Sequence, residues 1–154
     1  MSRREEQEVL SGVALTTFRL NGQVLEVAEE LARPVGLTAA WWQVLGAVLP
    51  EPLSVAGIAR AMGITRQSVQ RIADLLVERG LAEYRTNPAH RRAKLLAPTD
   101  AGREAVGRID PAHAALARRL TQEMGFEAFH AAWQALRQLS AAFDAIVAPA
   151  EADD

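Results

Sequence analysis

Residues 54–80 hold the signals that start and stop two short helices on either side of a tight turn. Ser54 stands where an N-cap would, and Gly63 ends the first helix because glycine readily adopts the left-handed conformation. Thr65 offers a hydroxyl to cap the second helix, which Gly80 closes. The apolar residues of both helices recur three and four positions apart, and they are Val55, Ile58, Ala59, Met62, Val69, Ile72, Ala73, Leu76 and Val77. This spacing predicts a helix-turn-helix with one buried face.

The other face of the second predicted helix is rich in hydrogen-bonding and cationic side chains. Its first two turns present Thr65, Arg66, Gln67, Ser68, Gln70 and Arg71. In the major groove of DNA, arginine pairs with guanine, glutamine pairs with adenine, and Ser or Thr contacts phosphate or a base edge. We therefore predict that this helix reads DNA. A merely solvated helix face is the alternative.

The charge distribution sets this segment apart from the rest of the chain. The 154 residues carry a formal net charge of -2, which argues against a protein that coats nucleic acid by bulk charge. Between Arg60 and Lys94, however, eight Lys or Arg residues stand against three acids. An acidic protein with one basic segment indicates local, directed contact with a polyanion.

A long amphipathic helix is predicted over residues 1 to about 33. Ser2 and Glu5 have the spacing of a capping box, and Pro34 followed by Gly36 ends the segment. A helix of this length in a small protein usually needs a partner along its whole length.

A second helix is predicted from Thr38 to Leu49, before two prolines. It contains the adjacent Trp41 and Trp42, which point about 100° apart on a helix and so cannot both face the same neighbour. Core filling is the expected role of both. A cavity or a dimer contact is the alternative for one of them.

A β-hairpin is predicted directly after the helix-turn-helix. Residues 81–85 alternate in polarity, a turn-forming NPAHRR follows, and residues 93–98 read as the returning strand. The hairpin tip carries His90, Arg91 and Arg92 and is restrained by Pro88. A cationic tip beside a major-groove helix is well placed to enter the flanking minor groove, where arginine is attracted by the negative potential. A solvated turn with incidental arginines is the alternative.

Two helices are predicted in the last third of the chain. The first begins at Thr99 and Asp100, with a kink or brief break at Pro111. A turn follows around residues 123–125, and the last helix runs from Phe126 to about Val147. Pro149 and the acidic tail are expected to end the ordered chain.

Several classes of function lack the residues that they require. The chain has no cysteine, which excludes disulfides and thiolate metal sites, and it has no nucleophile elbow, phosphate-binding glycine loop or HExxH motif. An enzyme, a cofactor and a metal are therefore not expected. A metal site at His113 and His130 with Glu123 or Glu127 is the remaining alternative. The lack of an apolar run of membrane-spanning length, and of a signal peptide, indicates a cytoplasmic protein without membrane contact.

The order of the predicted elements resembles the MarR family of bacterial transcriptional regulators over nearly the whole chain. The family pattern in the hairpin is Asp-x-Arg, five residues, Leu-Thr-x-x-Gly. Arg92, Thr99 and Gly102 match this pattern, whereas His90 stands in place of the acid and Pro98 in place of the leucine. The resemblance implies a mostly α fold with a small β-wing, in which a winged helix-turn-helix is flanked by long N- and C-terminal dimerisation helices.

The resemblance also implies an arrangement and a function. We expect a single domain over 1–154, with a DNA-binding lobe at about 37–98 and dimerisation helices at 1–36 and 99–148. The protein would bind double-stranded DNA as a homodimer, with two recognition helices on a pseudo-palindromic operator. The residues expected at DNA are Ser54, Thr65, Arg66, Gln67, Ser68, Gln70, Arg71, His90, Arg91 and Arg92.

Many relatives of this kind release DNA when a small aromatic or anionic ligand binds beside the dimerisation helices. The candidates to line such a site are Phe18, Arg19, Trp41 and Trp42. Arg19 is an isolated cation in an otherwise apolar stretch, which suits an acidic ligand. An exposed or ion-paired arginine is the alternative. The function expected is that of a ligand-responsive repressor, and the rival is a winged-helix module for protein interaction or dimerisation without a DNA role.

Overall fold

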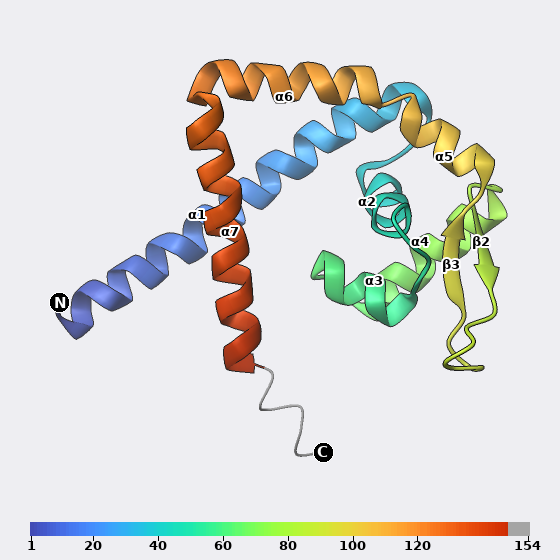
Figure 1. The fold of residues 1–154 in the computed structure, drawn as a ribbon, viewed down its shortest axis with the longest axis horizontal. Coiled ribbons are helices and arrows are strands. Elements are labelled where there is room, and N and C mark those ends of the chain that lie inside the picture. The colour runs from blue at the N-terminus through green and yellow to red at the C-terminus, as the bar shows by residue number, and fades with distance from the viewer. Residues whose placement is uncertain (148–154) are drawn as a thin grey trace. The chain divides into compact units, whose positions relative to one another are not determined.

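The computed structural model describes residues 1–147 of the chain, which divides into two units, residues 1–110 and the segment from Pro111 onward (Figure 1). The elements in chain order are α1 (Arg3–Ala32), the 3-10 helix η1 (Arg33–Val35), α2 (Ala39–Val48), β1 (Leu53–Ser54), α3 (Val55–Met62), α4 (Arg66–Glu78), β2 (Ala82–Arg85), β3 (Leu95–Pro98), α5 (Asp100–Gly107), α6 (Asp110–Met124) and α7 (Phe126–Val147). The mostly α fold with a small β-wing is confirmed. The predicted end of order at Pro149 lies outside the described residues.

Side-chain N-caps fix where the helices begin, at the predicted helix starts. Thr38, Ser54, Thr65 and Thr99 each accept a hydrogen bond from the backbone N–H three residues on, at 3.1 Å in all four cases. Each bond satisfies one of the N–H groups that a helix start leaves without an intrahelical partner. Ser2 and the N3 residue Glu5 form the predicted capping box at the start of α1.

The core of the first unit lies where α2, α3 and α4 meet the sheet. The apolar faces of these elements interlock, and their largest fully buried side chains are Val44, Leu45, Val48, Ile58, Val69, Leu76 and Leu96. Trp41 and Trp42 are half-buried and pack against this core. The expectation that both would fill the core is therefore only partly met, because each keeps part of its ring at the surface. Arg79 covers the ring of Trp41, with its guanidinium carbon 5.6 Å from the ring centroid.

The sheet has three antiparallel strands in the order β1-β3-β2. The hairpin of β2 and β3 was predicted, whereas β1 was missed. Strand β1 has only two residues, and Leu53 pairs with Leu96 while Ser54 pairs with Leu95. This short pairing ties the start of α3 to the hairpin.

A close backbone contact joins α5 to the end of α4. Thr99 donates from its backbone N–H to the Leu81 carbonyl at 3.1 Å and from its hydroxyl to the Gly80 carbonyl at 2.6 Å. Gly102 lies against the same Leu81 carbonyl, leaving no room for a Cβ. The predicted break before Pro111 is confirmed, since α5 ends at Gly107 and α6 begins at Asp110.

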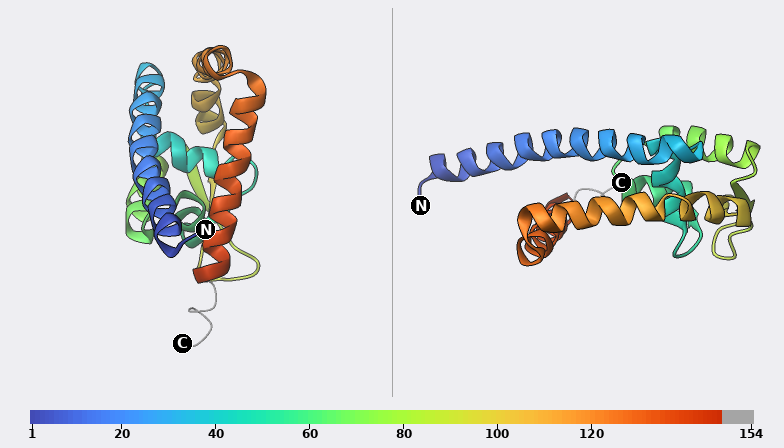
Figure 2. Two further views of the ribbon diagram at one scale, coloured as in Figure 1. Left: turned by 90° about the vertical axis from the view of Figure 1, so that its left-hand side faces the viewer. Right: turned by 90° about the horizontal axis from the view of Figure 1, so that it is seen from above.

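The long terminal helices expose much of their apolar surface. The first two thirds of α1 extend away from the winged lobe, and Ala32 is its one buried residue (Figure 2). Neither α6 nor α7 has a buried residue. The large apolar side chains of α1 and α7 that are at least half exposed are Val9, Leu10, Leu15, Phe18, Val24, Phe126, Trp133, Phe143, Ile146 and Val147. None of the helices within residues 1–147 has the length and apolar character needed to cross a membrane.

Candidate nucleic-acid interface

Helix α4 turns one face into the core and the other to solvent. Its buried residues are Val69, Ile72, Ala73 and Leu76. Because these occupy one side of the helix, Arg66, Gln67, Gln70 and Arg71 are exposed on the other. The start of the helix is capped, since Thr65 accepts from the Ser68 N–H and also donates to the Ser68 hydroxyl at 2.9 Å.

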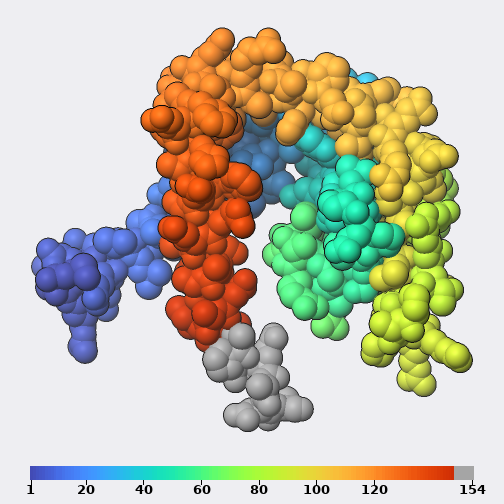
Figure 3. Space-filling view, in the orientation of Figure 1, coloured from blue at the N-terminus to red at the C-terminus, as the bar shows by residue number. Residues whose placement is uncertain are grey.

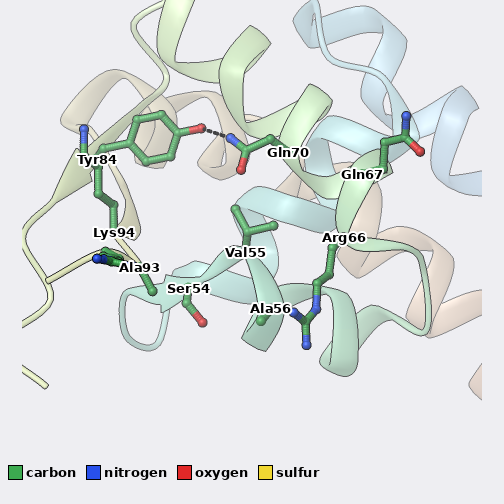
Figure 4. A pocket seen from close by; sticks show the side chains of 10 residues that line it. Ser54, Val55, Ala56, Arg66, Gln67, Gln70, Tyr84, Ala93 and Lys94 are labelled. Carbon is green, nitrogen blue, oxygen red and sulfur yellow. Dashed lines mark hydrogen bonds between the residues drawn. The ribbon is translucent and has the colours of Figure 1, made fainter. Parts of the chain in front are cut away.

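A concavity of about 590 Å³ lies between the starts of α3 and α4 and the base of the wing (Figure 4). The structure brings five of the predicted DNA-binding residues together there, and they are Ser54, Arg66, Gln67, Gln70 and Arg92. The other lining residues are Val55, Ala56, Tyr84, Ala93 and Lys94. The predicted residues outside this lining are Thr65, Ser68, Arg71, His90 and Arg91. Helix α4 and the wing thus place their polar and cationic side chains around one open concavity.

The cations of this surface are available to a polyanion. Within residues 1–147 the ion pairs join Arg4 to Glu8, Glu83 to Arg85 and Glu104 to Arg108. In that part of the chain, the guanidinium groups of Arg66, Arg71, Arg91 and Arg92 therefore have no carboxylate partner. Unpaired arginines on an exposed face are the groups that neutralise phosphates.

The wing loop is shaped by its own backbone. The Asn87 side chain accepts from the Ala89 N–H at 3.0 Å, and the Asn87 carbonyl accepts from the His90 N–H at 3.2 Å. These bonds form a tight turn over residues 87–90, and a second turn follows in which the His90 carbonyl accepts from the Ala93 N–H at 3.2 Å. His90, Arg91 and Arg92 are all exposed, and the loop projects beyond α3 and α4 (Figure 3).

A side-chain network that the sequence reasoning missed joins α4 to β2. Gln70 Nε2 donates to Asp74 Oδ1 at 3.0 Å and to the Tyr84 hydroxyl at 2.9 Å, and the Tyr84 hydroxyl donates to Asp74 Oδ1 at 2.5 Å. Lys94 lies over the Tyr84 ring, 5.9 Å from its centroid. The four-residue spacing of Gln70 and Asp74 on a helix was a usable signal, but nothing local in the sequence connects them to Tyr84.

The network changes the acidity of the tyrosine. Burial, and then the hydrogen bond to Asp74 and its negative charge, raise the pKa of Tyr84 to about 12. Because the folded pKa exceeds the unfolded value, the contribution of this group to stability is complete below about pH 10 and is lost as the pH rises toward 12.

We expect a tyrosinate absorbance titration to report this network directly, because Tyr84 is the only tyrosine of the chain. The folded protein should titrate with a midpoint near 12, and Asp74→Ala should lower that midpoint toward 10 by removing the acceptor and the charge. Glu83→Gln, on the same strand, is the charge-matched control and should leave the midpoint in place. An unchanged midpoint in Asp74→Ala would contradict the network.

The predicted ligand-binding residues lie on separate parts of the first unit. Phe18 is 72% exposed, and Arg19 beside it is also exposed. Phe18 is about 20 Å along the helix axis from Ala32, where α1 enters the core. Trp41 and Trp42 pack against that core from α2. The described chain therefore does not gather these four residues around one cavity.

The histidines considered as metal ligands lie on α6 and α7. In the part of the chain that the structure describes, no group of three or more His, Asp or Glu residues is placed to hold a metal ion. His130 instead stacks on Phe126, at a centroid distance of 6.1 Å, and meets Trp133 edge-on, at 5.9 Å.

A helix-turn-helix followed by a β-hairpin wing, with a cationic concavity between them, defines a winged helix-turn-helix DNA-binding protein. The sequence model of the MarR family matches residues 35–93. The chain belongs to the MarR family, and it is a DNA-binding transcriptional regulator, not an enzyme.

Known proteins resemble the chain over most of its length. The uncharacterized protein Rv2011c of Mycobacterium tuberculosis is 38% identical over 128 residues, which cover 83% of this chain and 90% of that protein. The transcriptional repressor CouR bound to a 23-mer DNA duplex is 30% identical, with a TM-score of 0.71 over 91% of this chain and 99% of CouR. CouR from Rhodococcus jostii RHA1 bound to p-coumaroyl-CoA is 27% identical, with a TM-score of 0.57 over 74% of this chain and 92% of that one.

Proposed function

We propose that this protein is a dimeric repressor that binds a pseudo-palindromic operator and releases it when a small ligand binds. The observation that carries the DNA-binding part is the concavity where Arg66 on α4 and Arg92 on the wing face the same open space. A similar chain, CouR, is a transcriptional repressor that binds a DNA duplex, which supports the assignment.

In this proposal the surface divides into two groups of contacts. Helix α4 enters the major groove, where Arg66, Gln67, Ser68, Gln70 and Arg71 meet base edges and nearby phosphates. Ser54 and Thr65 lie near phosphates at the starts of α3 and α4. His90, Arg91 and Arg92 follow the minor groove beside it.

Alanine substitutions should separate these two groups. We expect Arg66→Ala or Arg71→Ala to weaken binding to the preferred duplex by about 1–3 kcal/mol if the side chain contacts a base. Arg92→Ala should weaken binding to preferred and scrambled duplexes alike, and it should reduce the salt slope by about 1. Fluorescence anisotropy at several salt concentrations measures both effects. Arg108→Ala, at the C-cap of α5, is the matched control because it removes an equal charge from an ion pair with Glu104. Unchanged affinity in all three site variants would defeat the assignment and favour a winged-helix module without a DNA role.

The dimer is proposed from the surface that the terminal helices leave uncovered. Phe18 on α1 is 72% exposed, and Trp133 and Ile146 on α7 are 56% and 74% exposed. Apolar stripes of this extent on a monomer in water are costly. A second copy of the chain would cover these stripes and place two recognition helices about one helical turn of DNA apart.

The ligand response is proposed from the composition of α1 and α2 together with the binding of p-coumaroyl-CoA by CouR. Phe18, Arg19, Trp41 and Trp42 supply aromatic surface and a cation, which suit an aromatic acid or its thioester. Since one chain holds Phe18 and Arg19 apart from the tryptophans, the site would be completed by a helix of the second copy.

We expect an aromatic acid or its coenzyme A thioester to quench tryptophan fluorescence and to release bound DNA, with p-coumarate and p-coumaroyl-CoA as the first probes. Arg19→Gln should weaken this response about 10-fold by removing a charge-assisted hydrogen bond. Arg4→Gln, which removes an equal charge from the exposed start of α1, should leave it unchanged. If the ligand released DNA from Arg19→Gln at the same concentrations as from the wild-type protein, the ligand-binding site would lie elsewhere.

A further inference from the structure

The amide group of Gln70 is already committed within the protein. Its nitrogen donates to Asp74 Oδ1 at 3.0 Å and to the Tyr84 hydroxyl at 2.9 Å, which uses both of its hydrogens. Figure 4 shows the bond to Tyr84, which reaches α4 from strand β2. The only hydrogen-bonding atom of the side chain that is left for a ligand is Oε1, which can accept but cannot donate.

The neighbours themselves fix this orientation of the amide. An ionised carboxylate only accepts hydrogen bonds, so the amide atom facing Asp74 must be the nitrogen. The single hydrogen of the Tyr84 hydroxyl is directed to Asp74 Oδ1 at 2.5 Å, so this hydroxyl can only accept from Gln70. Turning the amide over would break two hydrogen bonds, one of them to a charged group, and would place the amide oxygen against the carboxylate.

A free glutamine reads adenine with two hydrogen bonds, donating to N7 and accepting from the N6 amino group. Gln70 cannot donate to N7 while its amide nitrogen donates to Asp74 and Tyr84. We propose that Gln70 reads only the exocyclic amino group of adenine or cytosine in the major groove, and that Asp74 and Tyr84 are the positioning residues that impose this restriction. The inference rests on the proposed function, in which α4 enters the major groove.

Atom-level substitution in the operator tests the proposal. The base pair to examine is the one at which Gln70→Ala abolishes base discrimination in a duplex selected by the wild-type protein. At this pair, replacing the purine by its 7-deaza analogue removes N7, and replacing adenine by purine or cytosine by its deamino analogue removes the amino group. For the wild-type protein, we expect less than about a 2-fold loss of affinity without N7 and about a 3- to 10-fold loss without the amino group.

Freeing the amide should change what Gln70 reads. In the double variant Asp74→Ala/Tyr84→Phe, both hydrogens of the amide nitrogen become free to donate to DNA. We expect the base preference at this pair to move toward adenine, and we expect removal of N7 to lower the affinity by about 3- to 10-fold. Glu83→Gln is the matched control, because Glu83 precedes Tyr84 on β2 and pairs with Arg85 at 2.8 Å. It removes one negative charge from the wing without touching Gln70, and it should keep the wild-type pattern. Circular dichroism confirms that each variant is folded.

The outcomes separate this inference from the function on which it rests. If the wild-type protein binds specifically but loses affinity when N7 is removed, the inference is overturned and the proposed regulatory function still holds. Specific binding that is indifferent to Gln70→Ala at every position would also overturn it. Failure of the wild-type protein to prefer any duplex would overturn the proposed function, and the inference with it.

Discussion

Gly102→Ala should destabilise the protein by on the order of 3 kcal/mol, the largest effect that we expect from adding a single methyl group. A Cβ at this position would lie 2.0 Å from the Leu81 carbonyl oxygen and 3.4 Å from Leu45 Cδ2. The obstructing atom is backbone, and it is held from both sides. The Leu81 carbonyl accepts from the Thr99 N–H at 3.1 Å, and the Leu81 N–H donates to the Leu76 carbonyl at 2.9 Å. Neither partner can move without breaking the junction between α4, β2 and α5.

Urea denaturation measures this effect, and the same helix provides the control. At Gly107, the last residue of α5, a Cβ would meet no atom within 4 Å, so Gly107→Ala should be neutral or should stabilise by up to about 1 kcal/mol through helix propensity. Similar small effects for the two substitutions would show that α5 does not approach the Leu81 backbone as described.

The double variant Phe143→Glu/Ile146→Glu should dissociate the dimer into monomers. These side chains are 50% and 74% exposed on α7, and in the proposed dimer they would be covered by the second copy. Leaving a charge buried without a partner costs about 3–5 kcal/mol, so self-association should weaken by about 100-fold or more. Sedimentation velocity measures the dissociation. Affinity for a duplex with two half-sites should fall to that for one half-site, because the second recognition helix is no longer tethered.

Gln134→Glu with Gln138→Glu is the matched control for this experiment. Both glutamines are exposed on α7 and lie on the side of the helix away from Phe143 and Ile146. The control adds the same charge to the same helix, and it should remain dimeric. Equal sedimentation of the two double variants as dimers would exclude this stripe from the interface.

The predictions that the structure confirms depend on local chemistry. A Ser or Thr before an apolar repeat marks a helix start because its hydroxyl satisfies a nearby backbone N–H, and Thr38, Ser54, Thr65 and Thr99 all do so. Gly63 and Gly80 stop their helices with φ of 66° and 73°. Such signals act within a few residues, so they can be recognised without knowing what packs against what.

The features that were missed depend on residues far apart in the chain. Strand β1 has two residues, too few to show any alternation, and it exists because β3 is beside it. Tyr84 meets Asp74 across ten positions and Gln70 across fourteen, after the turn at Gly80 has folded the wing back on α4. Gly102 matches the family pattern, but the pattern does not explain why glycine is required there. The reason is the Leu81 carbonyl oxygen, a backbone atom that lies where a Cβ would be.

The central claim is that α4 and the wing together bind a specific DNA sequence. Fluorescence anisotropy on duplexes tiled from the DNA upstream of the gene, titrated with salt and with unlabelled competitor, tests it most directly. We expect saturable, nanomolar binding to one symmetric site that weakens steeply as salt rises. Weak binding that is the same for every duplex, including those selected from a random pool, would contradict it.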